Sequence, residues 1–149
     1  MSKLAEFLKE RKELNEEVKK KSEETLIQWK REIDTLFSKI DSWLELAKSE
    51  GLVVKRLEGA KEITERLLGT YKTPVLEIRF ADKIVRLEPV GRYIIGGYGR
   101  IDIFSPNGVY TLVKLSPEED EWFLVDKKGT KRKLTRDLFE DFLIKAFSN

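Results

Sequence analysis

The chain has 149 residues, of which 40% are hydrophobic and 38% are charged, and its 29 basic and 27 acidic side chains leave a formal net charge of +2. A chain of this length fits one compact domain with an appendage, and it excludes a large multidomain enzyme. Because cysteine and histidine are both absent, disulfides, thiol nucleophiles, serine–histidine triads and zinc sites built on Cys or His are excluded.

The sequence also argues against contact with a membrane. No apolar run approaches the roughly 20 residues that a membrane-spanning helix needs. The first residues mix acids and bases and lack the apolar stretch of a secretory signal. We therefore expect an intracellular, cytoplasmic protein with no membrane partner, and the near-neutral charge gives no bulk attraction for nucleic acid.

The distribution of glycine and proline divides the chain in two. Residues 1–50 contain neither, whereas all nine glycines and all four prolines occur from Gly51 onward. Both residues are costly inside helices and common in turns. We predict a helical, coiled-coil-like segment over 1–50 and a sheet with a C-terminal helix over 51–149, which together can form one compact domain. Gly51 suits a helix C-cap.

The first stretch of the helical segment carries a weak apolar stripe. Its members are Leu4, Phe7, Leu8, Leu14 and Val18. The three lysines at 19–21 suit a helix C-terminus, and Ser22 followed by two glutamates suits a new N-cap. Two helices, 3–20 and 23–50, are therefore favoured over one. A single helix would be roughly 70 Å long, and part of its stripe would then need a partner chain.

A stronger stripe follows in a different register, with apolar residues at alternating spacings of three and four, as in a coiled coil. Its members are Leu26, Trp29, Ile33, Leu36, Ile40, Trp43 and Ala47. Phe37 and Leu44 widen the stripe, which favours packing on a globular surface. Two interpretations stay open: the residues from Leu26 to Trp43 form a partner interface, or the stripe and its tryptophans belong to the core.

After Gly51 the apolar pattern changes to a period of two, which is typical of strands. The expected extended segments are 52–57, 75–80, 84–88, 92–95, 100–104, 109–115, 121–126 and 131–134, and 60–70 reads as a strand or as irregular structure. Ala81 to Lys83 and Pro106 to Gly108 form turns, and Gly96 and Gly97 mark a bend. Thr135 can N-cap a final amphipathic helix. The sequence therefore predicts an α+β fold: N-terminal helices, one long or two antiparallel, an antiparallel meander of about five to seven strands, and a C-terminal helix, with the helices on one sheet face.

The glycine cluster at 91–99 does not have the spacing of a nucleotide-binding loop. A dinucleotide fingerprint needs Gly-x-Gly-x-x-Gly at the start of a helix. Here Gly97-x-Gly99 is followed at the required place by Asp102, and a strand follows. We therefore expect a structural bend and no cofactor.

The segment 99–103, Gly-Arg-Ile-Asp-Ile, followed by 111–115, resembles part of the core of the restriction-endonuclease-like nucleases of the PD-(D/E)xK superfamily. In that family a Gly-(Arg)-x-Asp strand and a following Glu-x-Lys strand supply two acids that hold Mg²⁺. The resemblance implies Asp102 as the first metal ligand. The Glu position is instead occupied by Lys114, which would repel Mg²⁺, and Ser116 stands at the Lys position.

Strand geometry gives Asp102 a different role. A two-residue loop at Pro106 and Asn107 pairs Asp102 with Thr111 and places Lys114 on the opposite sheet face, because side chains alternate. We therefore expect a structural Asp102, bound to Arg100 or Thr111, and no metal site unless the nuclease resemblance holds.

Two groups of cationic and aromatic side chains suit phosphates and bases. The candidate nucleic-acid contacts are Arg92, Tyr98, Arg100, Lys127, Lys128, Lys131, Arg132 and Lys133. The basic turn can equally be a solvated hairpin whose lysines block edge pairing, and the aromatic residues can be part of the sheet.

No catalytic motif is assembled in the sequence, so we assign no catalytic residue. The favoured interpretation is a non-catalytic interaction or adaptor module, with a protein partner or a second copy bound through the helical seam. The alternative is a nucleic-acid-associated protein, in the form of a degenerate restriction-endonuclease-like domain.

Overall fold

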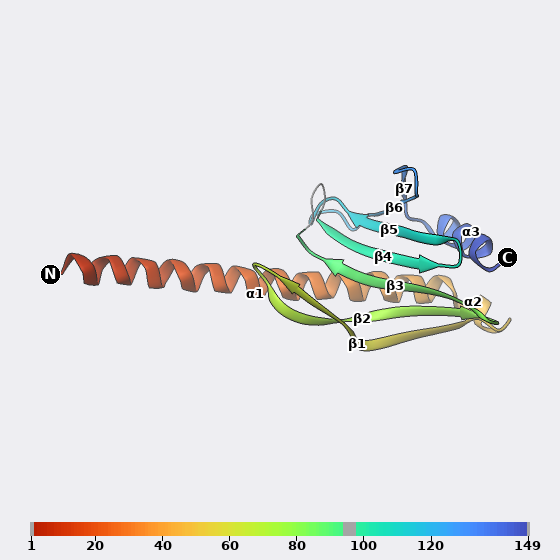
Figure 1. Ribbon diagram of the computed structural model, residues 1–149, viewed down its shortest axis with the longest axis horizontal. Coiled ribbons are helices and arrows are strands. Elements are labelled where there is room, and N and C mark those ends of the chain that lie inside the picture. Colours follow the sequence, from red (N-terminus) through yellow and green to blue (C-terminus); the bar gives the residue numbers. More distant parts are fainter. Residues whose placement is uncertain (1, 94–97, 149) are drawn as a thin grey trace.

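The computed structural model describes residues 2–93 and 98–148. It opens with one long helix, α1 (Lys3–Trp43), followed by a single short turn of helix, α2 (Glu45–Lys48). The C-terminal half of α1 lies along the sheet, whereas its N-terminal half projects into solvent beyond every other element (Figure 1).

A seven-stranded sheet occupies the middle of the chain. Its strands are β1 (Val53–Glu65), β2 (Gly69–Phe80), β3 (Lys83–Gly91), β4 (Gly99–Ser105), β5 (Gly108–Lys114), β6 (Trp122–Val125) and β7 (Lys131–Lys133). Each strand pairs with the next in antiparallel register, so the spatial order equals the sequence order. Helix α3 (Arg136–Phe147) ends the fold. This architecture confirms the predicted α+β class, with a single N-terminal helix rather than a pair.

The division of α1 into two helices was wrong. Residues 19–25 hold no glycine or proline, and the hydroxyl of Thr25 donates to the carbonyl of Lys21 at 2.9 Å inside the helix. Lysines at 19 and 20 also lie four residues before glutamates at 23 and 24, a spacing at which opposite charges stabilise a helix. The change of stripe register therefore occurs without a break in the backbone.

The predicted termini of the other helical elements agree with the structure. Gly51 has φ +98°, and its N–H donates to the carbonyl of Lys48 at 3.3 Å, which ends α2. Thr135 is the N-cap of α3, and its side-chain oxygen accepts from the N–H of Leu138 at 3.1 Å.

The first hairpins are longer than the alternation predicts. β1 continues through most of the ambiguous segment 60–70 and pairs with β2 on both sides of an irregularity between Leu57 and Lys61. The turn between β2 and β3 lies at Ala81, which takes φ 54°. The strand expected at 92–95 is not formed at Arg92 and Tyr93, which bend away after β3. Its other two residues, and the bend expected at Gly96 and Gly97, lie outside the described residues.

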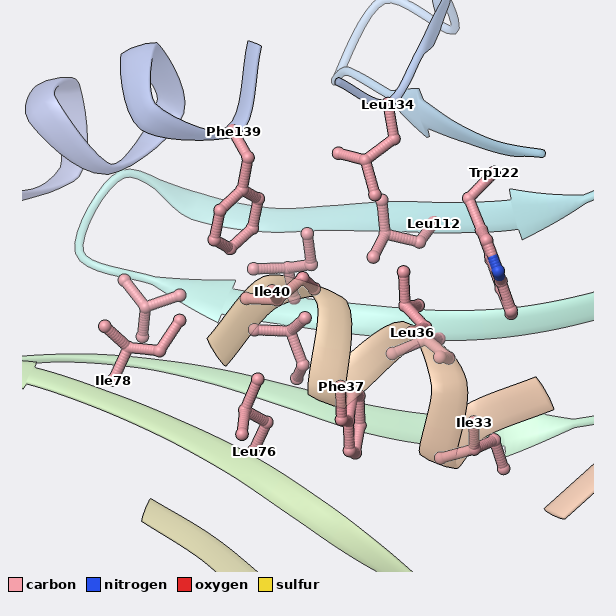
Figure 2. Packing of buried hydrophobic residues seen from close by; sticks show 14 of the residues in the cluster. Ile33, Leu36, Phe37, Ile40, Leu76, Ile78, Leu112, Trp122, Leu134 and Phe139 are labelled. Atoms are coloured by element: carbon pink, nitrogen blue, oxygen red, sulfur yellow. The ribbon is translucent and has the colours of Figure 1, made fainter. Parts of the chain in front are cut away.

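The core lies between one face of the sheet and the two long helices. Buried side chains from α1 interdigitate with those of the central strands, and Phe139 of α3 closes the same layer (Figure 2). Trp43 and Phe139 pack with ring centroids 6.3 Å apart, which joins the two helices. The largest fully buried side chains are Trp29, Ile33, Leu36, Phe37, Ile40, Leu76, Ile78, Leu87, Ile101, Ile103, Leu112 and Phe139. Both helices therefore cover one sheet face, as predicted.

Candidate functional site

Residues 3–25 of α1, here called the overhang, form the most unusual surface of the molecule. At 1.5 Å per residue they extend about 35 Å, and nearly all of their side chains are exposed. The large apolar side chains of the overhang are 50% to 65% exposed: Leu4, Phe7, Leu8, Leu14 and Val18. The structure thus leaves these apolar side chains uncovered by any other described element.

The stripe of the overhang has its own repeat. Leu4, Phe7, Arg11, Leu14 and Val18 follow at spacings of three, four, three and four, the spacing of the seam positions in a coiled coil. One flank of this seam is acidic, with glutamates at 10, 17 and 24. The overhang therefore combines a seam containing one central cation with a continuous acidic border.

The partner interface predicted farther along the helix is not a surface. Trp29, Ile33 and Ile40 are completely buried against the sheet, and Leu36 is almost so. Leu26 and Trp43 are partly buried and pack against the same core. The expectation of a partner there was wrong because the chain's own sheet covers the seam; the core interpretation of the two tryptophans is the one that the structure supports.

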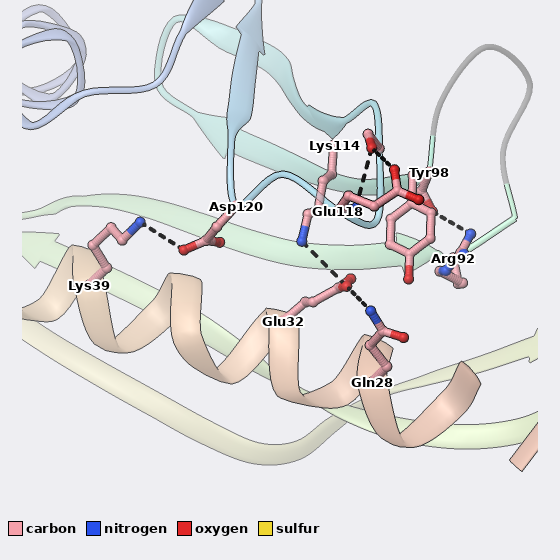
Figure 3. A network of polar contacts seen from close by, with 9 residues as sticks. Gln28, Glu32, Lys39, Arg92, Tyr98, Lys114, Glu118 and Asp120 are labelled. Carbon is pink, nitrogen blue, oxygen red and sulfur yellow. Dashed lines mark hydrogen bonds and ion pairs between the residues drawn. The ribbon is translucent and has the colours of Figure 1, made fainter. Parts of the chain in front are cut away.

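A second feature lies where the overhang meets the body. Gln28 and Glu32 of α1, Lys114 at the end of β5, and Tyr98 before β4 form a group that we call the polar cluster (Figure 3). The Nζ of Lys114 lies 3.3 Å from Oε1 of Glu32, and Nε2 of Gln28 donates to the same oxygen at 3.3 Å. The side chains of Lys114 and Glu32 are only 3% and 10% exposed. A buried ion pair of this kind costs desolvation energy, so its presence calls for a reason.

Arg92 holds Tyr98 in this cluster. The guanidinium carbon of Arg92 lies 3.0 Å from the centre of the Tyr98 ring, and its NH1 donates to the carbonyl of Tyr98 at 3.0 Å. Burial, reinforced by the negative charge of Glu32, raises the pKa of Tyr98 to about 12. The Tyr98 hydroxyl is therefore neutral at physiological pH.

The polar cluster opens into a cavity of about 530 Å³ between α1 and the segment that connects β5 to β6. Its lining includes Gln28, Glu32 and Lys114 on one side and Pro117, Glu118 and Asp120 on the other. Asp120 is held toward α1 by an ion pair with Lys39 at 3.4 Å, and Glu118 accepts a hydrogen bond from the hydroxyl of Ser116 at 2.8 Å. The Lys39 ion pair thus ties the segment over the cavity to α1, whereas the bond between Ser116 and Glu118 is internal to the segment.

The predicted nucleic-acid contacts do not form one surface. Arg92 and Tyr98 precede β4, and the ring of Tyr98, which is buried, is covered by Arg92. Arg100 binds Asp102 through two hydrogen bonds, at 2.9 Å and 3.2 Å. These three residues lie near the start of β4. Their cationic and aromatic groups contact one another or Asp102 within the chain.

The second basic group lies at the β6–β7 hairpin: Lys127 and Lys128 are in the turn after β6, and residues 131–133 form β7. The Nζ of Lys127 donates to the carbonyl of Asn107, and Lys133 pairs with Glu121 at 3.0 Å. The cations of this turn are all exposed: Lys127, Lys128, Lys131, Arg132 and Lys133. Strands β5 and β6 lie between β4 and β7, so the structure divides the predicted contacts into two sets.

Asp102 has the structural environment that strand geometry predicts. It lies opposite Thr111 in the β4–β5 pairing, and the Thr111 hydroxyl donates to it at 3.4 Å, in addition to the two bonds from Arg100. Lys114 lies opposite Gly99, and its side chain is buried toward α1. Asp102 and Lys114 therefore serve opposite faces of the sheet and do not converge as the two metal-binding motif positions of the nuclease superfamily would.

Sequence reasoning identified Lys114 only as a departure from a motif, and it did not single out Glu32. The available signal was the alternation in β5, where Lys114 continues the inward positions of Tyr110 and Leu112. A lysine at an inward position needs a buried acid. Which of the 27 acidic residues supplies it depends on how α1 lies across the sheet, and the sequence alone does not specify that.

Within residues 2–93 and 98–148, no three acidic side chains group closely enough to hold a metal ion. No helix in the described part of the chain is long and apolar enough to cross a membrane. Comparisons with protein-family models, with curated proteins and with solved structures found no match to this chain.

Proposed function

We propose that this protein is a non-catalytic, intracellular interaction module that self-associates through the overhang of α1. The observation that carries the proposal is the apolar stripe of the overhang, which no other described element covers. Isolated helices are only marginally stable in water, and most helices in proteins depend on packing of an apolar face. A partner helix would supply that packing.

The overhang is suited to a second copy in antiparallel orientation. When Phe7 of one helix is placed against Val18 of the other, Arg11 lies against Leu14, and the pair is symmetric about its centre. In this register Arg11 of each copy lies beside Glu10 and Glu17 of the other, which provides opposite charge for the cation in the seam. A parallel pair would instead place Arg11 against Arg11.

The length of the overhang fits the same register. Lys3 of one helix lies opposite Ser22 of the other, so the first turn of each α1 lies just before the point near Leu26 where the partner's sheet begins to cover its own helix. The two sheets then lie at opposite ends of the helical pair and do not collide. An isologous two-fold dimer of this kind is the commonest form of self-association.

The test is the mass of the full chain in solution, measured by size-exclusion chromatography with light scattering at about 0.15 M salt. The expected mass is twice the 17.4 kDa of one chain. Phe7→Asp with Leu14→Asp should give a folded monomer. The matched control Ala5→Asp adds the same type of charge on the opposite side of the overhang and should remain a dimer. A wild-type monomer at micromolar concentration would refute self-association, and co-eluting nucleic acid would support the alternative function.

Disulfide cross-linking tests the relative orientation of the two helices. Because the sequence contains no cysteine, only the introduced thiols can form disulfides. Mixed Phe7→Cys and Val18→Cys chains should form disulfide-linked heterodimers. Either variant alone should cross-link poorly, because in the antiparallel pair Phe7 lies about 16 Å along the axis from its own symmetry mate. Efficient homodimer cross-links with Val18→Cys alone would show a parallel pair.

A further inference from the structure

An apolar groove lies between the end of α1, α2 and α3, at the opposite end of the molecule from the overhang (Figure 1). Its volume is about 520 Å³, and its lining includes the buried side chains of Leu44, Leu52 and Leu143. Leu46 of α2 and Ile144 of α3 also line it and are 78% and 63% exposed. Leu46 is the most exposed large apolar side chain in the described part of the chain. One surface therefore presents both apolar protrusions and an apolar depression.

Arg136 marks one end of the groove. There Trp43 packs on Phe139 with ring centroids 6.3 Å apart, and Arg136 lies one helical turn before Phe139 on α3. Nε of Arg136 donates to Glu140 at 2.8 Å, whereas its two terminal amino groups bond to no described residue. A guanidinium carries five donors, so these two groups can bind a second carboxylate.

The other end of the groove carries an acid. There Phe80 packs on Phe147 with ring centroids 5.9 Å apart, and a Cβ built on Gly51 would lie 3.8 Å from the Phe80 ring. Glu50, the residue before Gly51, lines the groove and forms no ion pair with a described residue. With a cation at one end and an acid at the other, the groove is complementary in charge to an antiparallel copy of itself.

We propose that this groove binds the same groove of a second copy about a two-fold axis that sets the two grooves antiparallel. Leu46 and Ile144 of each copy pack into the groove of the other, and Arg136 of each copy pairs with Glu50 of the other. A small ligand on the groove floor would leave the protruding Leu46 and Ile144 in water, whereas a second copy covers them. The contact uses one self-complementary patch twice, as an isologous interface requires.

The groove and the overhang lie at opposite ends of the molecule (Figure 1). The groove is short, and interfaces that bury less than about 1,200 Å² are weak, so its pairing follows that of the overhang as the concentration rises. The two contacts together would join dimers end to end into linear chains. Only this chain formation rests on the proposed function, because the groove contact does not involve the overhang.

The test is sedimentation equilibrium of the full chain from about 10 μM to about 1 mM, a range that covers weak association. Phe7→Asp with Leu14→Asp should be monomeric at the lowest concentration and dimeric at the highest, whereas the wild type should pass beyond the dimer. Ile144→Asp in the same background should stay monomeric throughout. The control Lys145→Gln changes the charge by the same amount at the next residue, which is exposed and does not line the groove, and should still dimerise.

The outcomes separate the two contacts. An overhang variant that stays monomeric at about 1 mM would overturn the groove contact and leave the overhang pairing intact. Saturable binding of an anilinonaphthalene sulfonate dye by that monomer, lost on Ile144→Asp, would assign the groove to a small apolar ligand instead. An overhang variant that is already dimeric at the lowest concentration, and monomeric once Ile144→Asp is added, would contradict the overhang pairing and support the groove.

Charge reversal tests the antiparallel register in the same background. Arg136→Glu and Glu50→Arg should each weaken self-association about tenfold, because like charges then meet at both ends of the contact. An equimolar mixture of the two variants should form heterodimers with the original affinity, since every cation again meets an acid. Both positions are exposed, so neither change threatens the fold. A mixture that associates no better than either variant alone would overturn the proposed contact.

Discussion

The indole N–H of Trp29 donates to the hydroxyl of Tyr71 at 3.1 Å in the buried layer between α1 and the sheet. The Tyr71 hydroxyl in turn donates to Oε2 of Glu65, whose other oxygen accepts from the backbone N–H groups of Arg92 and Tyr93 at 2.9 Å and 2.8 Å. One relay of hydrogen bonds therefore links the helix, the β1–β2 hairpin and the segment after β3. The bonds from Trp29 and to Glu65 both depend on the single hydroxyl group of Tyr71.

Tyr71→Phe should destabilise the protein because it leaves the buried indole N–H of Trp29 without a partner and removes the donor to Glu65. The expected loss is about 1 to 3 kcal/mol in the free energy of unfolding, measured by urea denaturation. Tyr93→Phe is the control, because the Tyr93 side chain is exposed and should change stability by no more than about 0.5 kcal/mol. Equal midpoints for the two variants would show that the relay does not contribute to stability.

Stability should also fall at alkaline pH, because the fold disfavours ionised tyrosine. Burial is the main cause that raises the pKa of Tyr71 above its ordinary value and that of Tyr98 to about 12. A group whose pKa is higher in the folded state stabilises fully below its unfolded pKa of 10, and this contribution is lost as the pH rises from 10 toward 12. The check is urea denaturation across this interval.

Tyr98→Phe isolates one of these two tyrosines. It keeps the ring under Arg92 but has no titratable hydroxyl, so the fall in stability between pH 10 and about 12 should be shallower than in the wild type. Tyr93→Phe should leave the slope unchanged. An identical slope for Tyr98→Phe and the wild type would contradict the assigned cause.

The sequence predicted the strands and turns well because alternation and turn chemistry are local. Asp102 against Thr111 followed from the loop at Pro106 and Asn107 alone, and the structure confirms it. The cap at Thr135 followed from one side chain in the same way. A turn or a helix cap depends only on residues that are close in the sequence, so the sequence alone was sufficient to predict it.

The helical region shows the limit of that reasoning. Both apolar stripes of α1 have coiled-coil spacing, yet Ile33 is buried by the sheet while Leu14 is exposed. Spacing identifies an apolar face but not what covers it, since that depends on how far the sheet extends along the helix. The polar cluster escaped prediction for the same reason, because Glu32 and Lys114 lie 82 positions apart in the sequence and meet only when α1 lies across β5.

Gly99→Ala should destabilise the fold through contact with α1. An added Cβ at Gly99 would lie 2.5 Å from Cζ3 of Trp29, a completely buried ring that has no room to move. Overpacking of this kind costs about 1 to 3 kcal/mol. The control Ala60→Gly is also an exchange between glycine and alanine in a strand, but at an exposed position of β1. It should lower the free energy of unfolding by at most about 1 kcal/mol. A Gly99→Ala variant as stable as the wild type would mean that the helix sits farther from β4 than the structure places it.

Ile33→Asp should unfold the whole protein, because it places an unpaired charge in the completely buried seam between α1 and the sheet. The less drastic Ile33→Ala should cost about 2 to 5 kcal/mol, whereas Ile144→Ala, on the exposed side of α3, should cost about 0.5 kcal/mol or less. Circular dichroism at increasing temperature measures the unfolding of all three variants. The protein concentration is kept the same, because self-association makes the apparent Tm depend on concentration. If Ile33→Asp kept a folded sheet and lost only dimer mass, the seam would be a partner interface and the overhang would not be needed for self-association. Loss of the sheet signal together with the helix signal is the expected result, since one core serves both.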